Sequence, residues 1–166
     1  MEMLFAFLIT GLIVFSLVSI SIFSGRSFAA YANYVELNDD NRFAMDMLTR
    51  DLRECTRVAA ATTNSLSLED LDGTYIDYAY NATAKTVTRR KQPGAPKVIL
   101  SGCDGIRFRL LQRNPKYGTW DGYDAATPAT AKVVDVAWNC SREILGAKAN
   151  TENVQTARIV IRRQSL

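Results

Sequence analysis

The chain contains no histidine among its 166 residues. This absence excludes a Ser/His/Asp triad, a Cys/His nucleophile pair and most catalytic zinc sites, because each of these needs an imidazole. The cysteines Cys55, Cys103 and Cys140 are too far apart for a CxxC redox or zinc pattern. Three cysteines permit one disulfide and a free thiol, although we favour three buried thiols. The sequence therefore argues against an enzyme, and we expect neither a cofactor nor a metal ion.

Charged residues are nearly missing from the first 24 positions, where Glu2 stands alone. About 20 apolar residues in a helix rise about 30 Å, which matches the hydrocarbon core of a bilayer. We therefore predict a membrane-resident helix over residues 1–25. A cleaved secretory signal is a second interpretation, since Ala30–Ala32 has the A-x-A form, but the apolar run is long and no basic residue precedes it. A buried core helix is the third, and such helices are usually shorter.

Two features of the apolar run suggest contact with other helices. Small residues let helices approach closely in lipid, and four lie here: Gly11, Ser16, Ser19 and Ser21. Glu2 falls in the first helical turn, where the positive end of the helix dipole favours a carboxylate. A carboxylate beside an apolar helix is nevertheless costly unless it meets a cation or stays among the headgroups.

The helical pattern continues beyond the apolar run, because proline is absent until Pro93. Apolar residues then recur at steps of three and four, as an amphipathic helix requires. This stripe consists of Met45, Leu48, Leu52, Cys55 and Ala59. We predict an amphipathic helix over 26–60 that packs this stripe on a sheet and continues the first helix as one rod. The short polar side chains at 38–41 are expected to loosen or kink it.

After residue 60 the apolar period changes to two, which is typical of strands. Alternating apolar residues include Leu66 and Leu68, then Ile76, Tyr78 and Tyr80, and later Val134, Val136 and Trp138. Turn-forming residues separate these runs, and 114–130 is interpreted as a loop. We predict an antiparallel β domain over 61–166. The fold class is α+β, with a long N-terminal helix packed on an antiparallel sheet.

Two kinds of short motif receive plain structural interpretations. The segments Asp70–Gly73 and Asp121–Asp124 contain oxygen ligands suited to calcium, but neither completes an EF-hand pattern, so surface turns are favoured. Arg107 and Arg109 alternate with apolar residues, which favours a solvated strand face. Since the net charge is only +3, we expect no nucleic-acid partner.

The order of these elements resembles type IV pilins and the pseudopilins of type II secretion. Glu2 followed by Met3–Ala6 is similar to the tail of the prepilin cleavage motif, and Arg42–Arg53 is similar to the second helical half of J-type minor pseudopilins and related minor pilins. Looser similarities cover Tyr78–Arg90, Val98–Arg109, Trp120 and Lys132–Trp138. Met1 stands where the family has Val or Ile, and the basic leader ending in glycine is missing. We therefore expect a truncated chain or a misassigned start.

The resemblance implies a non-enzymatic minor pseudopilin or minor pilin that initiates or caps a pilus-like filament in secretion or pilus assembly. It implies a single-pass protein of the bacterial inner membrane, with its globular part in the periplasm or on an extracellular filament. Homologous subunits would be partners through the N-terminal helix, and Glu2 would set subunit register by neutralising a neighbour's N-terminal amine. Two alternatives remain: a major pilin, and a membrane-anchored periplasmic binding or enzyme domain.

Overall fold

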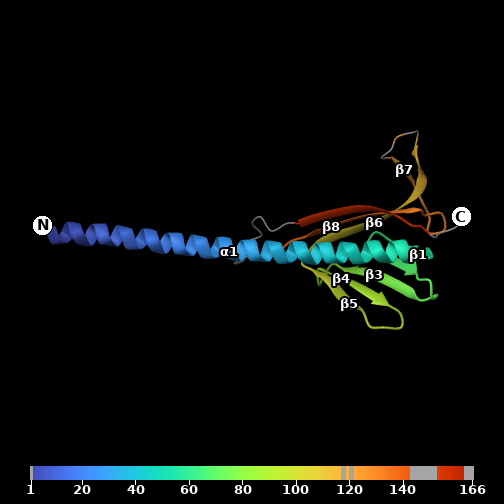
Figure 1. The fold of residues 1–166 in the computed structure, drawn as a ribbon, viewed down its shortest axis with the longest axis horizontal. Helices are drawn as coiled ribbons and strands as arrows, with labels where there is room; N and C mark the ends of the chain where they lie inside the picture. The colour runs from blue at the N-terminus through green and yellow to red at the C-terminus, as the bar shows by residue number, and fades with distance from the viewer. Residues whose placement is uncertain (1, 117–118, 120–121, 143–152, 163–166) are drawn as a thin grey trace.

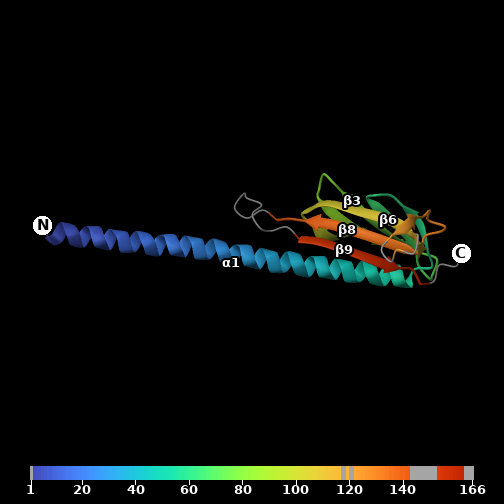
Figure 2. The ribbon, with the colours of Figure 1, turned by 90° about the horizontal axis from the view of Figure 1, so that it is seen from above.

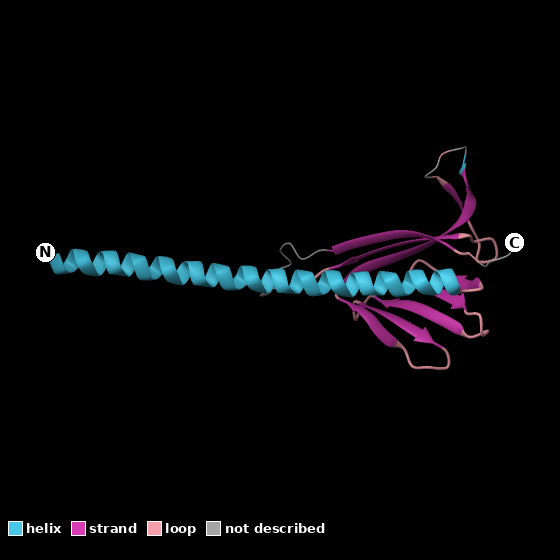
Figure 3. Cartoon of the chain, viewed as in Figure 1, coloured by secondary structure: helices cyan, strands magenta, loops and turns pink. Residues whose placement is uncertain are grey.

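A computed structural model describes residues 2–116, 119, 122–142 and 153–162 of the chain. In this part, one long helix precedes nine strands (Figures 1 and 3). The elements are α1 (Glu2–Glu54), β1 (Arg57–Ala61), β2 (Ser65–Glu69), β3 (Tyr75–Asn81), β4 (Thr86–Lys91), β5 (Lys97–Ser101), β6 (Cys103–Pro115), β7 (Tyr123–Ala125), β8 (Val133–Cys140) and β9 (Asn153–Val160). All strand pairs are antiparallel, and the predicted α+β class is confirmed.

The helix α1 is continuous over 53 residues, a length of about 80 Å. The predicted kink at 38–41 is wrong, because α1 passes through these positions without interruption (Figures 1 and 2). The Asn41 side-chain amide donates to the Leu37 carbonyl at 2.7 Å, and its oxygen accepts from Trp138 Nε1 at 2.7 Å. The amide nitrogen therefore bonds within its own preceding turn, and the amide oxygen links α1 to β8.

The helix ends at Glu54, and the predicted end at residue 60 is wrong. Thr56 N donates to the Glu69 carbonyl at 2.8 Å, and β1 then pairs with β2, with Val58 opposite Leu68. The alanine run that follows Val58 favours a helix by local propensity, but strand pairing and burial of Val58 override that weak preference. Ala59 therefore belongs to β1 and not to the helical stripe.

The strands form two sheets where the sequence predicted one. Sheet A has the order β1-β2-β3-β4-β5, and sheet B has the order β7-β6-β8-β9. The chain changes sheet at Gly102, whose φ is +71° and where an added Cβ would lie 2.6 Å from the Ser141 carbonyl oxygen. Only glycine adopts this conformation without strain. The loop predicted at 114–130 is also wrong in part, since β6 extends to Pro115 and β7 pairs with it.

The C-terminal part of α1 covers the junction of the two sheets. It contacts β9 of sheet B and β5 of sheet A. In Figure 1 the helix lies between the two sheets, and in Figure 2 it runs along one side of them. The predicted alternation in β2, β3 and β8 is confirmed, because its apolar side chains are buried, apart from the partly buried Tyr80. The core so formed fixes one half of α1 and leaves the other half bare.

Candidate assembly surface

The first half of α1 has no residue buried in the structure. The most apolar 18-residue window of the helix is entirely unburied and, by length and composition, could cross a membrane. Large side chains of this half of α1 are well exposed, with Phe15 at 72% and Phe23 at 73%. Exposed apolar residues continue past this window through Phe28, Tyr31 and Val35. A surface of this kind needs either lipid or other protein around it.

Three hydroxyl groups of this half are satisfied within the helix. Thr10 donates its hydroxyl to the Ala6 carbonyl at 2.8 Å, and Ser16 and Ser19 bond their own preceding turns in the same way. A shallow groove of about 460 Å³ lies at Gly11, and its other lining residues are Phe7, Thr10, Val14, Phe15 and Val18. The missing side chain at Gly11 leaves room for close approach of a second helix.

Glu2 lies exposed in the first turn of α1, at the end of the helix farthest from the sheets (Figure 1). This position favours a carboxylate through the helix dipole. The described residues give it no side-chain partner. Its predicted role in subunit register stays a prediction.

Of the predicted packing stripe, Met45, Leu48 and Leu52 lie on α1, and Cys55 follows directly after the helix ends at Glu54. Leu48, Leu52 and Cys55 are at most 1% exposed, and Met45 is half-buried against the core. The structure adds four buried helix residues that the sequence analysis missed: Leu37, Asn41, Ala44 and Asp51. Together with Leu48 they are spaced by three and four residues, as a buried helix face requires, but the polar Asn41 and Asp51 concealed this pattern.

Asp51 forms the principal polar link between α1 and sheet A. Its carboxylate accepts two hydrogen bonds from Arg89, from Nε at 2.7 Å and from a terminal nitrogen at 3.1 Å, and a third from the Tyr78 hydroxyl at 2.6 Å. Burial and the nearby Asp51 charge raise the pKa of Tyr78, while the hydrogen bond to Asp51 raises the pKa of Arg89. The tyrosine therefore stays neutral and the arginine charged, so all three bonds persist at physiological pH.

A second set of polar contacts ties α1 to sheet B, nearer the bare half of the helix. Arg142, just after β8, donates to Glu36 at 2.7 Å and to Asp40 at 3.0 Å. Asn153 at the start of β9 donates to Asn38 at 3.2 Å. Together with Asp51, these contacts hold the packed half of α1 at both ends, so the bare half projects in a defined direction.

Two of the three cysteines are bonded to each other, and the expectation of three thiols is wrong. Cys103 and Cys140 face each other in the register of β6 and β8 and form a disulfide. Cys55 is a free and buried cysteine. Burial, with smaller effects of Asp51 and Asp70, raises the pKa of Cys55 to about 11, so its thiol is protonated and unreactive at neutral pH.

The motifs considered for calcium do not form a metal site in the described residues. Asp70 and Asp72 lie in a turn with Gly73 and place their carboxylates 2.5 and 3.4 Å from Lys91 Nζ. No group of three or more acidic, histidine or cysteine side chains there could hold a metal ion. The second motif lies partly outside the described residues at Asp121, as does Trp120.

A scan of family models and a search of curated proteins each found no match to the chain. The architecture of a long N-terminal helix followed by antiparallel sheets is consistent with a pilin-like protein.

Proposed function

We propose that this protein is a minor pseudopilin or minor pilin, a structural subunit that initiates or caps an inner-membrane-anchored, pilus-like filament. One observation carries the proposal: a single uninterrupted helix has one half fixed in the globular core and the other half apolar and unburied. The bare half suits lipid before assembly. It also suits the flanks of homologous helices afterwards, because either environment covers the apolar surface.

Two features of the bare half support assembly through this surface. The groove at Gly11 offers room for a neighbouring helix. Glu2 would be buried in a helical bundle and would then require a cation, such as the N-terminal amine of a neighbour. A misplaced carboxylate would cost several kcal/mol, so a pair of this kind would favour one axial register.

The disulfide supports a location outside the cytoplasm. Cys103 and Cys140 join strands of sheet B, and disulfides persist in oxidising compartments such as the bacterial periplasm. This agrees with an inner-membrane anchor whose globular part is in the periplasm or on an extracellular filament.

Site-specific photo-crosslinking in cells tests the proposal. A photoreactive amino acid at Phe15 should form adducts with small single-span proteins that carry similar apolar N-terminal helices. The same group at Leu71, which is also well exposed but lies in the turn after β2, is the matched control and should not form these adducts. Adducts of Phe15 with lipid alone would contradict the proposal and would favour a membrane-anchored domain that acts singly.

A further inference from the structure

The part of α1 between the apolar run and the sheets carries different residues on its two sides. Arg26 is the first basic residue after the run, and Leu37 is the first buried residue of the helix. With 3.6 residues per turn, Arg26 and Asn33 lie on the same side as Leu37, which faces the sheets. Phe28 and Tyr31 lie about 180° and 120° around the helix from Leu37, on the side that faces away from the sheets.

Phe28 and Tyr31 are both well exposed, and we call these two residues the aromatic collar. The sheets run along one side of α1 (Figure 2), so the collar and the globular part lie on different sides of the helix. The collar side is apolar here, whereas the sheet-facing side carries the charge of Arg26 and the amide of Asn33. The helix is therefore asymmetric just where it leaves the apolar run.

The length of the apolar run places the collar at the surface of a bilayer. No charged residue occurs between Glu2 and Arg26, so this segment fills a hydrocarbon core of about 30 Å and Arg26 marks its edge. Phe28 and Tyr31 follow Arg26 by about 3 and 8 Å along the helix, within a headgroup layer of about 5–8 Å. Tyr34 lies about 12 Å beyond Arg26 and is outside this layer.

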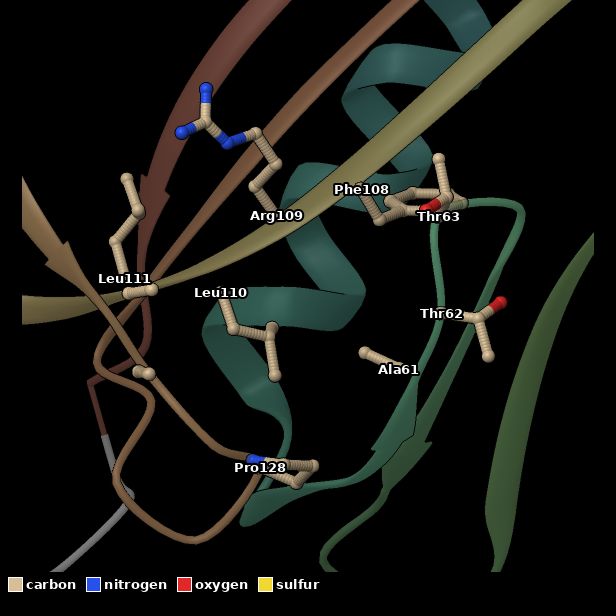
Figure 4. Close-up of a pocket in the computed structure, with 10 residues that line it drawn as sticks. Ala61, Thr62, Thr63, Phe108, Arg109, Leu110, Leu111 and Pro128 are labelled. Atoms are coloured by element: carbon tan, nitrogen blue, oxygen red, sulfur yellow. The ribbon is translucent and has the colours of Figure 1, made fainter.

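The globular part stays clear of this layer at its far end. A groove between β1 and β6 is lined in part by Ala61, Leu110 and Pro128 (Figure 4). The strand β1 follows the end of α1 at Glu54, about 42 Å along the helix from Arg26. Lipid therefore does not reach this groove, although it does reach the collar.

We propose that the aromatic collar binds the interfacial layer of the phospholipids and tilts α1 toward the collar side, which lifts the sheets away from the membrane. Aromatic rings favour this layer, and interfacial anchors set the tilt and rotation of a membrane helix. Tilt toward the collar lowers Phe28 and Tyr31 into the layer and raises Arg26 toward the phosphates and water. Tilt in the reverse direction would lower the Arg26 charge into hydrocarbon, which is costly.

This inference rests on the membrane-anchored state of the proposed function and names lipid as the partner of the collar before assembly. A neighbouring helix is the competing occupant. Nanodiscs of phosphatidylcholine that hold one full-length chain each separate the two, because they offer lipid without a second subunit.

Spin labels at two positions of α1 read the direction of tilt in these nanodiscs. Ser24 precedes Phe28 by four residues and lies on the collar side, while Ile22 precedes Arg26 by four residues and lies on the opposite side. Ser24→Cys and Ile22→Cys are labelled separately, since the buried Cys55 and the disulfide leave no other reactive thiol. Collisions of each label with oxygen, relative to collisions with a water-soluble nickel chelate, measure its depth.

The proposal predicts a reversed order of depth. In an upright helix, residue 24 lies about 3 Å nearer the membrane surface than residue 22. A tilt of about 20° toward the collar shifts their relative depth by about 4 Å, because the labels lie on opposite sides of a helix about 10–12 Å wide. We therefore expect the label at residue 24 to be the deeper one.

Alanine variants locate the cause of the tilt. Phe28→Ala/Tyr31→Ala should abolish the reversed order. The control Phe43→Ala, which removes an exposed ring about 25 Å beyond Arg26, should keep it. The upright order in the wild type, or a reversed order that survives loss of the collar, would overturn the inference and leave the proposed function intact. A label at Val14 that meets the chelate more than oxygen would instead refute the membrane span on which both rest.

Discussion

Individual polar residues fix the position of α1 on the sheets, and Asp51 accepts more side-chain hydrogen bonds from the strands than any other described residue of the helix. It is 7% exposed and accepts three hydrogen bonds from side chains of β3 and β4. Removing one member of a buried ion pair leaves the other charge without compensation, which costs more than the intact pair contributes.

Asp51→Asn should therefore destabilise the protein. The variant keeps the side-chain shape but leaves the Arg89 charge, which is 24% exposed, without its partner. We expect a loss of about 2 kcal/mol in the free energy of unfolding, since Arg89 retains some contact with water. Urea unfolding of the detergent-solubilised chain, followed by near-UV circular dichroism, measures it. Asp46→Asn, at an exposed position of the same helix, should change stability little; equal effects of the two variants would contradict the assigned role of Asp51.

The ionisation of the Asp77 carboxyl group makes the free energy of unfolding depend on pH in the acid range. Burial opposes its ionisation, but hydrogen bonds from Arg90, Gln92 and Ser67 lower the pKa of Asp77 below its usual value of 3.8. The unfolded chain therefore binds a proton at higher pH than the folded chain does. The stabilising contribution is complete above the unfolded-state pKa and is lost as pH falls through the lower folded-state pKa.

Asp77→Asn should accordingly weaken the dependence of the free energy of unfolding on pH at acidic pH. The wild-type free energy of unfolding should fall more steeply than that of the variant below a pH of about 4. Thermal unfolding at a series of pH values checks this. A variant whose curve runs parallel to that of the wild type would show that the Asp77 contacts contribute nothing to folding.

At the scale of elements, the decisive contact is between the buried stripe of α1 and the two sheets. Leu52 is fully buried in this contact, whereas Phe43 on the same helix is 60% exposed. Leu52→Ala should cost about 2–5 kcal/mol through lost burial and a residual cavity. Leu52→Asp should unfold the globular part or detach the helix, because it buries an unpaired charge.

Phe43→Ala serves as the control for the stripe and should change stability by less than about 0.5 kcal/mol. Thermal melting of all three variants compares them directly. A melting curve for Leu52→Asp that matches the wild type would show that α1 does not depend on this stripe for its position.

For the whole molecule, the disulfide predicts how many cysteine thiols can be alkylated before and after reduction. The chain has three cysteines, of which Cys103 and Cys140 are bonded and Cys55 is free. Mass spectrometry after alkylation should find one modified thiol in the unfolded, unreduced protein and three after reduction. In the folded protein Cys55 should react slowly, because it is buried and its pKa is about 11. Three modified thiols without reduction would rule out the disulfide.

Assembly is also a property of the whole molecule, and Glu2→Ala tests it in cells. If Glu2 pairs with a neighbour's amine, the variant should lower incorporation into the filament by about tenfold or more, since it leaves a buried charge unpaired. Its thermal melting should match the wild type, because Glu2 is exposed in the single subunit. Asp39→Ala, at another exposed acidic residue of α1, is the control. Normal incorporation of the Glu2 variant would refute the register role.

The sequence alone determined the apolar helix, the change of period after residue 60 and the α+β class. These follow from local patterns of apolar residues. A long apolar segment without charges has to be covered by lipid or protein, and an alternation of apolar and polar residues turns one face of a strand toward the core. The buried positions Leu48, Leu52 and Cys55 were predictable in the same way, because apolar spacing alone marks them.

Only the tertiary structure decided where α1 ends, which cysteines pair and how nine described strands divide into two sheets. Each of these depends on a partner from another strand or segment. Pairing with β2 makes residues 57–61 a strand instead of a continuation of the helix, and the register of β6 and β8 places Cys140 opposite Cys103. The Ser141 carbonyl oxygen leaves no room for a side chain at Gly102. The buried Asn41 and Asp51 were missed for the same reason. Burial of a polar side chain is tolerated only where hydrogen-bond partners are available. For Asn41 that partner is Trp138 of β8, and for Asp51 it is Arg89 of β4, so both partners come from other elements.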